Sequence, residues 1–212
     1  MTLFPKAFLV AATMTLAGCS AISSLTDATT PLQAYELRAP ADLPAPAVRG
    51  SLRRELAIEA PTTGGALDTD RIMIRPGPFE AQYLPEARWT DTAPVMLQTL
   101  MLRSFEDTNA LRYVGRRPLG GSGDYVLVSE LTDFQAELAP DGEAVTTRVR
   151  LVARLVRESD SSILGSRTIN TVAAATSSDT QDVVESFDRA TSAALKDLVG
   201  WAVGLMGLRV SG

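Results

Sequence analysis

Apolar and polar residues alternate regularly along residues 145–157. A period of two is typical of a β-strand with one buried face, so this segment predicts a long strand. The opposite, polar face carries Arg148, Arg150 and Arg154. Val152 lies on that face as an apolar exception. The predicted inward positions are Val145, Thr147, Val149, Leu151, Ala153 and Leu155.

Two further long strands are predicted on either side of this one, at residues 124–138 and 163–174. Turn residues separate them from it: Pro140-Asp141-Gly142 on one side and Asp160-Ser161 on the other. We therefore expect an antiparallel meander with one half-exposed face.

The first half of the chain predicts shorter strands, at residues 33–38, 52–60, 71–75 and 112–115, with a short edge strand at 79–83. Pro40, Pro44 and Pro46 interrupt regular structure after the first strand, and residues 61–65 form a predicted turn.

Two segments repeat their apolar residues at helical spacing. The first runs over residues 93–107, with Thr92 as its N-cap, and the second begins near Ser178 or Asp179 and ends at Gly204 and Gly207. The expected fold is a single α/β domain bordering on α+β, in which a mixed, largely antiparallel sheet carries two long helices. The stripe predicted for the second helix is Val184, Phe187, Thr191, Ala194, Leu195, Leu198 and Ala202.

The first twenty residues indicate export and lipidation. A weakly basic start with Lys6 precedes an uncharged apolar run over residues 7–18, as in a secretory signal. Leu16, Ala17 and Gly18 then lead into Cys19, the lipobox pattern in which small residues admit the backbone to a peptidase and the thiol receives the lipid. We expect a signal peptide at 1–18, a lipidated cysteine and flexible tether at 19–33, and the folded domain at 34–205. Ser20 follows where an inner-membrane retention signal of enterobacteria has aspartate, which favours the outer membrane.

The amino-acid composition excludes several classes of function. The chain has 20 basic and 25 acidic residues, and loss of Lys6 with the signal makes the net charge −6, with no basic stretch to suit nucleic acid. It has no histidine and one cysteine, which excludes His-based catalytic triads, His-ligated zinc and disulfides. Lys196 with Ser192 is either a solvated surface pair, which this spacing favours, or a Ser/Lys dyad. The glycine-rich residues 120–124 lack the lysine of a phosphate-binding loop and predict a flexible connection. We expect neither an enzyme nor a cofactor or metal site.

A series of ordered features carries a family resemblance. After the lipobox come Tyr35-Glu-Leu37, Arg71-Ile-Met-Ile-Arg75, and Tyr83 followed by Trp89-Thr-Asp-Thr-Ala-Pro94. Asp124-Tyr-Val-Leu127, Glu130-Leu-Thr-Asp-Phe134 and a closing helix with Ala193-Ala194 and Trp201 complete the order. Over residues 34–203 the chain resembles the ABC-type transport auxiliary lipoproteins.

The resemblance implies a role beside an ABC ATPase, a permease and a membrane-anchored Mce-domain protein that together move lipid between two membranes. The chain would be the lipid-anchored docking component at the outer membrane, facing the periplasm, without turnover of its own. The family offers no catalytic or ligand motif to transfer, so Cys19 is the functional residue that the resemblance supports.

Four residues are candidates for a partner interface. Trp89 is either a hydrophobic lid over a helix start or an aromatic contact residue. Arg148, Arg150 and Arg154 form either a solvated sheet face or a face for an acidic partner or lipid head groups. Trp201, with Leu205 and Met206, either contributes to the packing of the closing helix or forms a small exposed patch for contact in a homo-oligomer.

Two other functions stay open. A direct lipid carrier would need a large apolar cavity between sheet and helices, whereas a close-packed core would count against it. A lipoprotein regulator of cell-wall synthesis would have a similar size and architecture.

Overall fold

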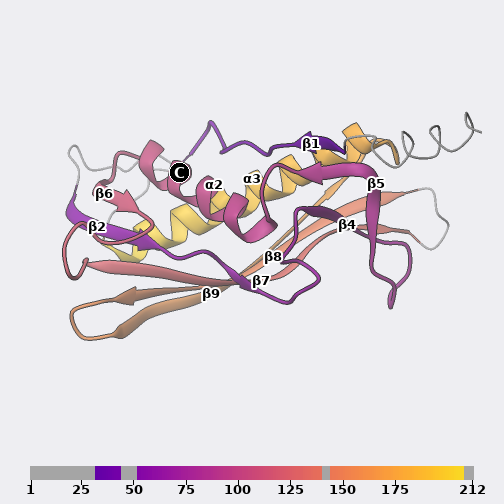
Figure 1. Ribbon diagram of the computed structural model, residues 1–212. Helices are drawn as coiled ribbons and strands as arrows, with labels where there is room; N and C mark the ends of the chain where they lie inside the picture. Colours follow the sequence, from indigo (N-terminus) through magenta and orange to yellow (C-terminus); the bar gives the residue numbers. More distant parts are fainter. Residues whose placement is uncertain (1–31, 44–51, 140–143, 208–212) are drawn as a thin grey trace, which may run out of the picture. The chain divides into compact units, whose positions relative to one another are not determined.

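Three long strands form the centre of the computed structural model, which describes residues 32–43, 52–139 and 144–207. They are β7 (Tyr125–Leu138), β8 (Val145–Arg157) and β9 (Ser162–Ala174). β7 and β9 both pair antiparallel with β8, as Ser129 opposite Ala153 and Leu151 opposite Ile169 show. The predicted meander is confirmed (Figure 1).

Short strands line the other edge of β7 end to end. β2 (Leu52–Ile58), β3 (Thr62–Thr63) and β4 (Arg71–Arg75) all pair parallel with it, in that order along its length. β6 (Leu111–Gly115) continues the sheet beyond β2, while β5 (Gln82–Trp89) and β1 (Gln33–Tyr35) continue it beyond β4. The sheet is therefore mixed, with its long pairs antiparallel and most short pairs parallel.

Two helices cover one face of the sheet, α2 (Ala93–Asp107) and α3 (Thr180–Leu205) (Figure 1). α3 packs on β8 and β9, and α2 lies between α3 and β6. Thr92 and Asp179 occupy the N-cap positions, and Asp182 lies in the first turn of α3, where the helix dipole favours a negative charge. The expected mixed sheet with two long helices is confirmed, and because the helices do not alternate with the strands the class is α+β. All seven residues of the predicted α3 stripe are buried.

The core between the layers is filled by aromatic side chains at its centre. Trp89 from β5, Phe134 from β7 and Phe187 from α3 are each at most 1% exposed. Their ring centroids lie 5.0–5.7 Å apart in tilted and edge-on arrangements, which aromatic pairs prefer. The six predicted inward positions of β8 are buried as well.

Two predictions in the first half of the chain are wrong. Residues 79–83 do not form a strand of their own, because β5 begins at Gln82, and Phe79 lies 98% exposed before it. Within β5 Pro85 has no N–H to donate and Glu86 adopts a φ of 57°, so a bulge interrupts the pairing with β4. Thr62 and Thr63, assigned to a turn, pair with β7 as β3. The predicted turn at 140–142 lies outside the described residues.

Candidate functional site

The lipobox residues Leu16, Ala17, Gly18 and Cys19 lie outside the described part of the chain. Lipidation of Cys19 and the boundaries 1–18 and 19–33 therefore stay predictions. None of the helices in the described ranges has the length and apolar character needed to cross a bilayer.

Trp89 has to be removed from the candidate interface residues. Its side chain is 0% exposed and packs against Phe134 and Phe187, just before α2 begins. A side chain without exposed surface cannot contact a partner in this fold, so of the two interpretations the core position holds.

The three candidate arginines share the sheet face turned away from the helices. Arg150 and Arg154 are exposed, whereas Arg148 is 33% exposed and engaged in an ion pair. Its Nε and Nη2 donate to Oε1 and Oε2 of Glu137 on β7, at 2.9 and 3.1 Å. The predicted arginine face therefore exists, with two of its arginines open to solvent.

Acidic and amide side chains of β7 form the second half of this face. Gln135, 2% exposed, donates from Nε2 to Asp133 Oδ1 at 3.1 Å and to Glu137 Oε1 at 3.0 Å. Its Oε1 accepts the backbone N–H of Phe134 at 2.9 Å. The hydrogen bond from Arg148 is the main cause that lowers the pKa of Glu137, and the same contact raises the pKa of Arg148.

Our sequence analysis missed these β7 partners, although a signal was present. Asp133 is register-paired with Arg150, and Gln135 with Arg148. Once the two strands are recognised as a hairpin, the acidic residues of one and the arginines of the other could have been matched. The bulge after Leu131 shifts this pairing by one residue, which the sequence pattern does not reveal.

A hollow of about 610 Å³ adjoins this polar face, between the turn after β4 and the second half of β7. Its lining is mixed, because both charge signs and an amide stand beside two prolines and a leucine. The lining residues are Arg75, Pro76, Gly77, Pro78, Asp133, Gln135, Glu137 and Leu138.

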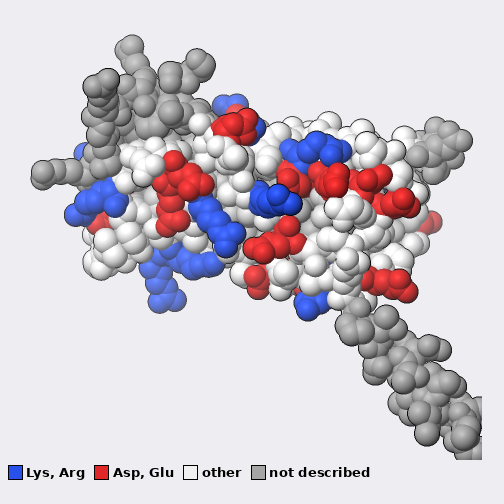
Figure 2. Space-filling view, turned by 90° about the horizontal axis from the view of Figure 1, so that it is seen from above, with Lys and Arg blue, Asp and Glu red and all other residues white. Residues whose placement is uncertain are grey.

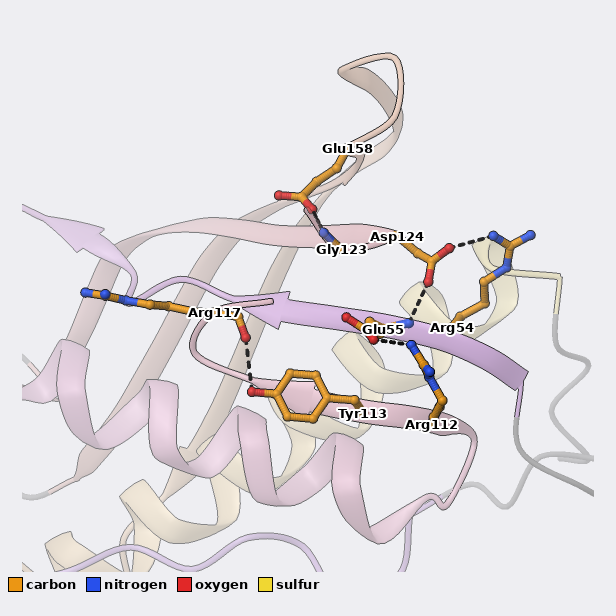
Figure 3. Close-up of polar contacts among 8 residues, drawn as sticks. All are labelled: Arg54, Glu55, Arg112, Tyr113, Arg117, Gly123, Asp124 and Glu158. Atoms are coloured by element: carbon orange, nitrogen blue, oxygen red, sulfur yellow. Dashed lines mark hydrogen bonds and ion pairs between the residues drawn. The ribbon is translucent and has the colours of Figure 1, made fainter. Parts of the chain in front are cut away.

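A second polar cluster lies at the start of β7 (Figure 3). Asp124 accepts Arg54 Nη1 at 2.6 Å and the backbone N–H of Glu55 at 2.9 Å. Burial raises the pKa of Asp124, but these two hydrogen bonds outweigh it and the net pKa is lowered. Arg112 also pairs with the buried Glu55. The cluster ties the start of β7 to β2 and β6.

The glycine-rich connection before β7 belongs to this cluster. Glu158 accepts the N–H of Gly123, and its own N–H donates to the carbonyl of Asp124 at 3.1 Å. Tyr113 donates its hydroxyl to the carbonyl of Arg117 at 3.0 Å (Figure 3). These contacts hold Gly123 and Asp124, at the end of the connection, in place beside β8.

The described residues offer binding surfaces and no group of metal-ligating side chains. Lys196 donates to Asp42 Oδ2 at 2.7 Å, as a surface ion pair. On the helix-covered side, basic and acidic side chains are interspersed (Figure 2).

The chain belongs to the family of ABC-type transport auxiliary lipoprotein components, whose model matches residues 35–199. This confirms the resemblance seen in the sequence. The family is a transport auxiliary component, non-enzymatic in kind, and a lipoprotein family implies anchoring to a membrane of the cell envelope.

Individual relatives agree with the family and its fold. The protein bll6063 of Bradyrhizobium diazoefficiens is 31% identical over 172 residues, which are 80% of this chain and 44% of that protein. The chain thus spans less than half the length of this relative. The crystal structure of XCC0632 from Xanthomonas campestris matches with a TM-score of 0.73 and 25% identity, over 82% of this chain and 97% of that one. A second crystal structure, 14% identical with a TM-score of 0.57, covers 77% of this chain and 97% of its own and shows the same fold.

Proposed function

We propose that this protein is the lipid-anchored auxiliary component of an Mce-type ABC system that moves lipid between the inner and outer membranes. The observation that carries the proposal is the family match over residues 35–199. Its partners are an Mce-domain membrane protein, the permease and the ATPase, and its part is docking.

The anchor follows from the sequence. Acylation of Cys19 would hold the protein on a membrane, since more than one acyl chain gives stable attachment. Thirteen residues lie between Cys19 and Gln33, where β1 begins, and an extended chain over that interval reaches about 50 Å. Ser20 favours the outer membrane, so the domain would work in the periplasm close to that membrane.

The packing of the domain favours docking over lipid carriage. Trp89, Phe134 and Phe187 occupy the space between sheet and helices, where a carrier would need an apolar cavity. The hollow beside β7 has a mixed lining, in which Arg75, Asp133, Gln135 and Glu137 stand beside prolines and Leu138. A lipid held at the centre of the core would have to displace the three aromatic side chains.

The arginine face is our candidate for the partner contact. Arg150 and Arg154 are exposed, and rim charges of this kind steer a complementary acidic surface into place. Arg148 is the less available member because Glu137 already binds it with both oxygens.

The proposal is tested by pull-down from detergent-solubilised envelopes, with the wild type and Cys19→Ala. We expect the wild type to recover an Mce-domain protein with its permease and ATPase, and the variant to lose them. Labelled palmitate should mark the wild type alone, which separates a missing anchor from a missing partner. Recovery of cell-wall synthases alone would instead support the regulator, and a lipidated protein without partners would contradict docking.

A further inference from the structure

β9 has a long free edge. Its 13 residues pair with β8 on one side, and no strand among the described residues pairs with the other side. Ser166, Arg167 and Thr168 at its centre are all exposed. Apart from the carbonyl of Ala174, which accepts Arg189 Nη2 at 2.6 Å, the main-chain N–H and C=O groups on that side are therefore available to another strand.

Proteins usually protect such edges, and the other two ends of this sheet follow that rule. β1 has three residues, and β6 has five with Arg112 among them. β9 contains no proline and one charged residue, Arg167, which points to the helix side and binds Asp197 Oδ1 at 2.6 Å. Of these three edges, β9 alone is both long and uncharged on its outer face.

Rows of side chains across the sheet end abruptly at β9. Val126, Val156 and Ile163 face one another across β7, β8 and β9, and Ile163 is left 59% exposed at the end of the row. Val172 is 56% exposed near the other end of the strand. Between these two, the outer face presents Ser166, Thr168 and Asn170.

We propose that β9 binds an extended segment of a partner protein, which adds to the sheet as a further strand. This inference rests on the proposed function, because the partner is taken to be a component of the same transport system. Main-chain hydrogen bonds would supply the affinity and side chains the specificity. The segment would carry an apolar residue beside Ile163 and uncharged, mostly β-branched or hydroxyl residues along the centre.

A second copy of this chain fits the edge less well. The bulge between Ile163 and Gly165 changes which residues face outward. In a two-fold antiparallel pair of β9 strands centred on Thr168, the bulge of each strand would lie opposite the regular end of the other. Main-chain hydrogen bonds would then form only near Thr168. The same arrangement would bring the two Arg167 side chains together on one face, where like charges repel.

The test places a photo-crosslinking amino acid at Thr168 of the full-length, lipidated protein in envelopes. Thr90 is the matched control, because it is an exposed threonine that follows β5, on the opposite side of β7 from β9. We expect adducts at Thr168 with one protein of the transport system, and none at Thr90. Probes at Ser166 and Asn170 should map to partner residues two positions away from the first site, as an extended strand requires.

A second measurement uses Thr168→Lys with Asn170→Lys, which charges the edge and leaves the core unchanged. We expect recovery of the complex to fall roughly tenfold, since added lysines block strand addition. Thr90→Lys should leave the recovery unchanged. Adducts with a second copy, or no adduct at Thr168, would overturn the inference. If the wild type still recovered the transporter, the proposed function would stand while the strand addition failed.

Discussion

Arg148 and Glu137 are diagonal neighbours across the β7–β8 hairpin, and the guanidinium donates to both carboxylate oxygens, at 2.9 and 3.1 Å. Gln135 supplies a third hydrogen bond to the same carboxylate. This contact joins the arginine face to the acidic residues of β7, and it holds Glu137 in its charged form.

The lowered pKa of Glu137 makes this contact dependent on pH. The unfolded chain has the ordinary glutamate pKa near 4.5, so the stabilisation is complete above that value. It is lost as the pH falls through the lower folded-state pKa, because the unfolded state binds the proton more readily. Since both side chains are about one-third exposed, we expect less than about 1 kcal/mol. From pH 3 to pH 7 the free energy of unfolding, measured by urea denaturation, should rise less in Glu137→Gln and in Arg148→Gln than in the wild type. The difference from the wild type should be the same for both variants. An unchanged pH dependence in both variants would contradict the pairing.

Replacement of Trp89 by alanine should strongly destabilise the fold. The side chain is fully buried against Phe134 and Phe187, and such truncations cost about 3–5 kcal/mol. Phe79→Ala is the matched control, because Phe79 is 98% exposed and should change the free energy of unfolding by less than about 0.5 kcal/mol. Equal effects of the two substitutions in urea denaturation would show that Trp89 is not in the core.

Gln135 fills a gap in the hydrogen bonding of β7. β3 pairs with Glu130 and Leu131, β4 pairs with Ala136 and Glu137, and the side chain of Gln135 accepts the N–H of Phe134 between them. Gln135→Leu would leave that buried N–H without a partner, at a cost of about 1–3 kcal/mol. Gln181→Leu, at an exposed position on α3, should cost little in the same urea experiment. A stable Gln135→Leu protein would mean that the N–H finds another acceptor.

Charge reversal on the arginine face should weaken the complex without unfolding the domain. Arg150 and Arg154 are exposed, so Arg150→Glu with Arg154→Glu is expected to keep the melting temperature within a few degrees. Recovery of the transporter should fall, and the difference from the wild type should shrink as salt is raised. Arg103→Glu with Arg117→Glu, at two other exposed arginines, makes the same change in net charge and serves as the control. Equal losses in both would exclude a specific contact at β8.

The spacing of apolar residues predicted correctly those elements that bury one face against the core. Residues 145–157 and 93–107 have the same bounds in the structure, because alternation and helical spacing both follow from burial on the core side. The two apolar residues on the outer face of β8, Val152 and Val156, are half-buried there.

Partners and interruptions were not predictable in the same way. Periodicity does not state which strand pairs with which, so the three short strands along one edge of β7 could not be foreseen. Pro85 reads as a strand breaker, yet the bulge at Glu86 lets β5 continue through it. Trp89 was ambiguous because an aromatic residue before a helix serves a core or an interface equally well.

The central claim is that this chain is a docking component of an Mce-type transporter. It is tested most directly by purifying the complex through another of its components. An affinity tag on the ATPase should recover the permease, the Mce-domain protein and this chain in constant ratio, from membranes carrying lipidated Cys19. The account would be contradicted if the other three components were recovered intact without this chain.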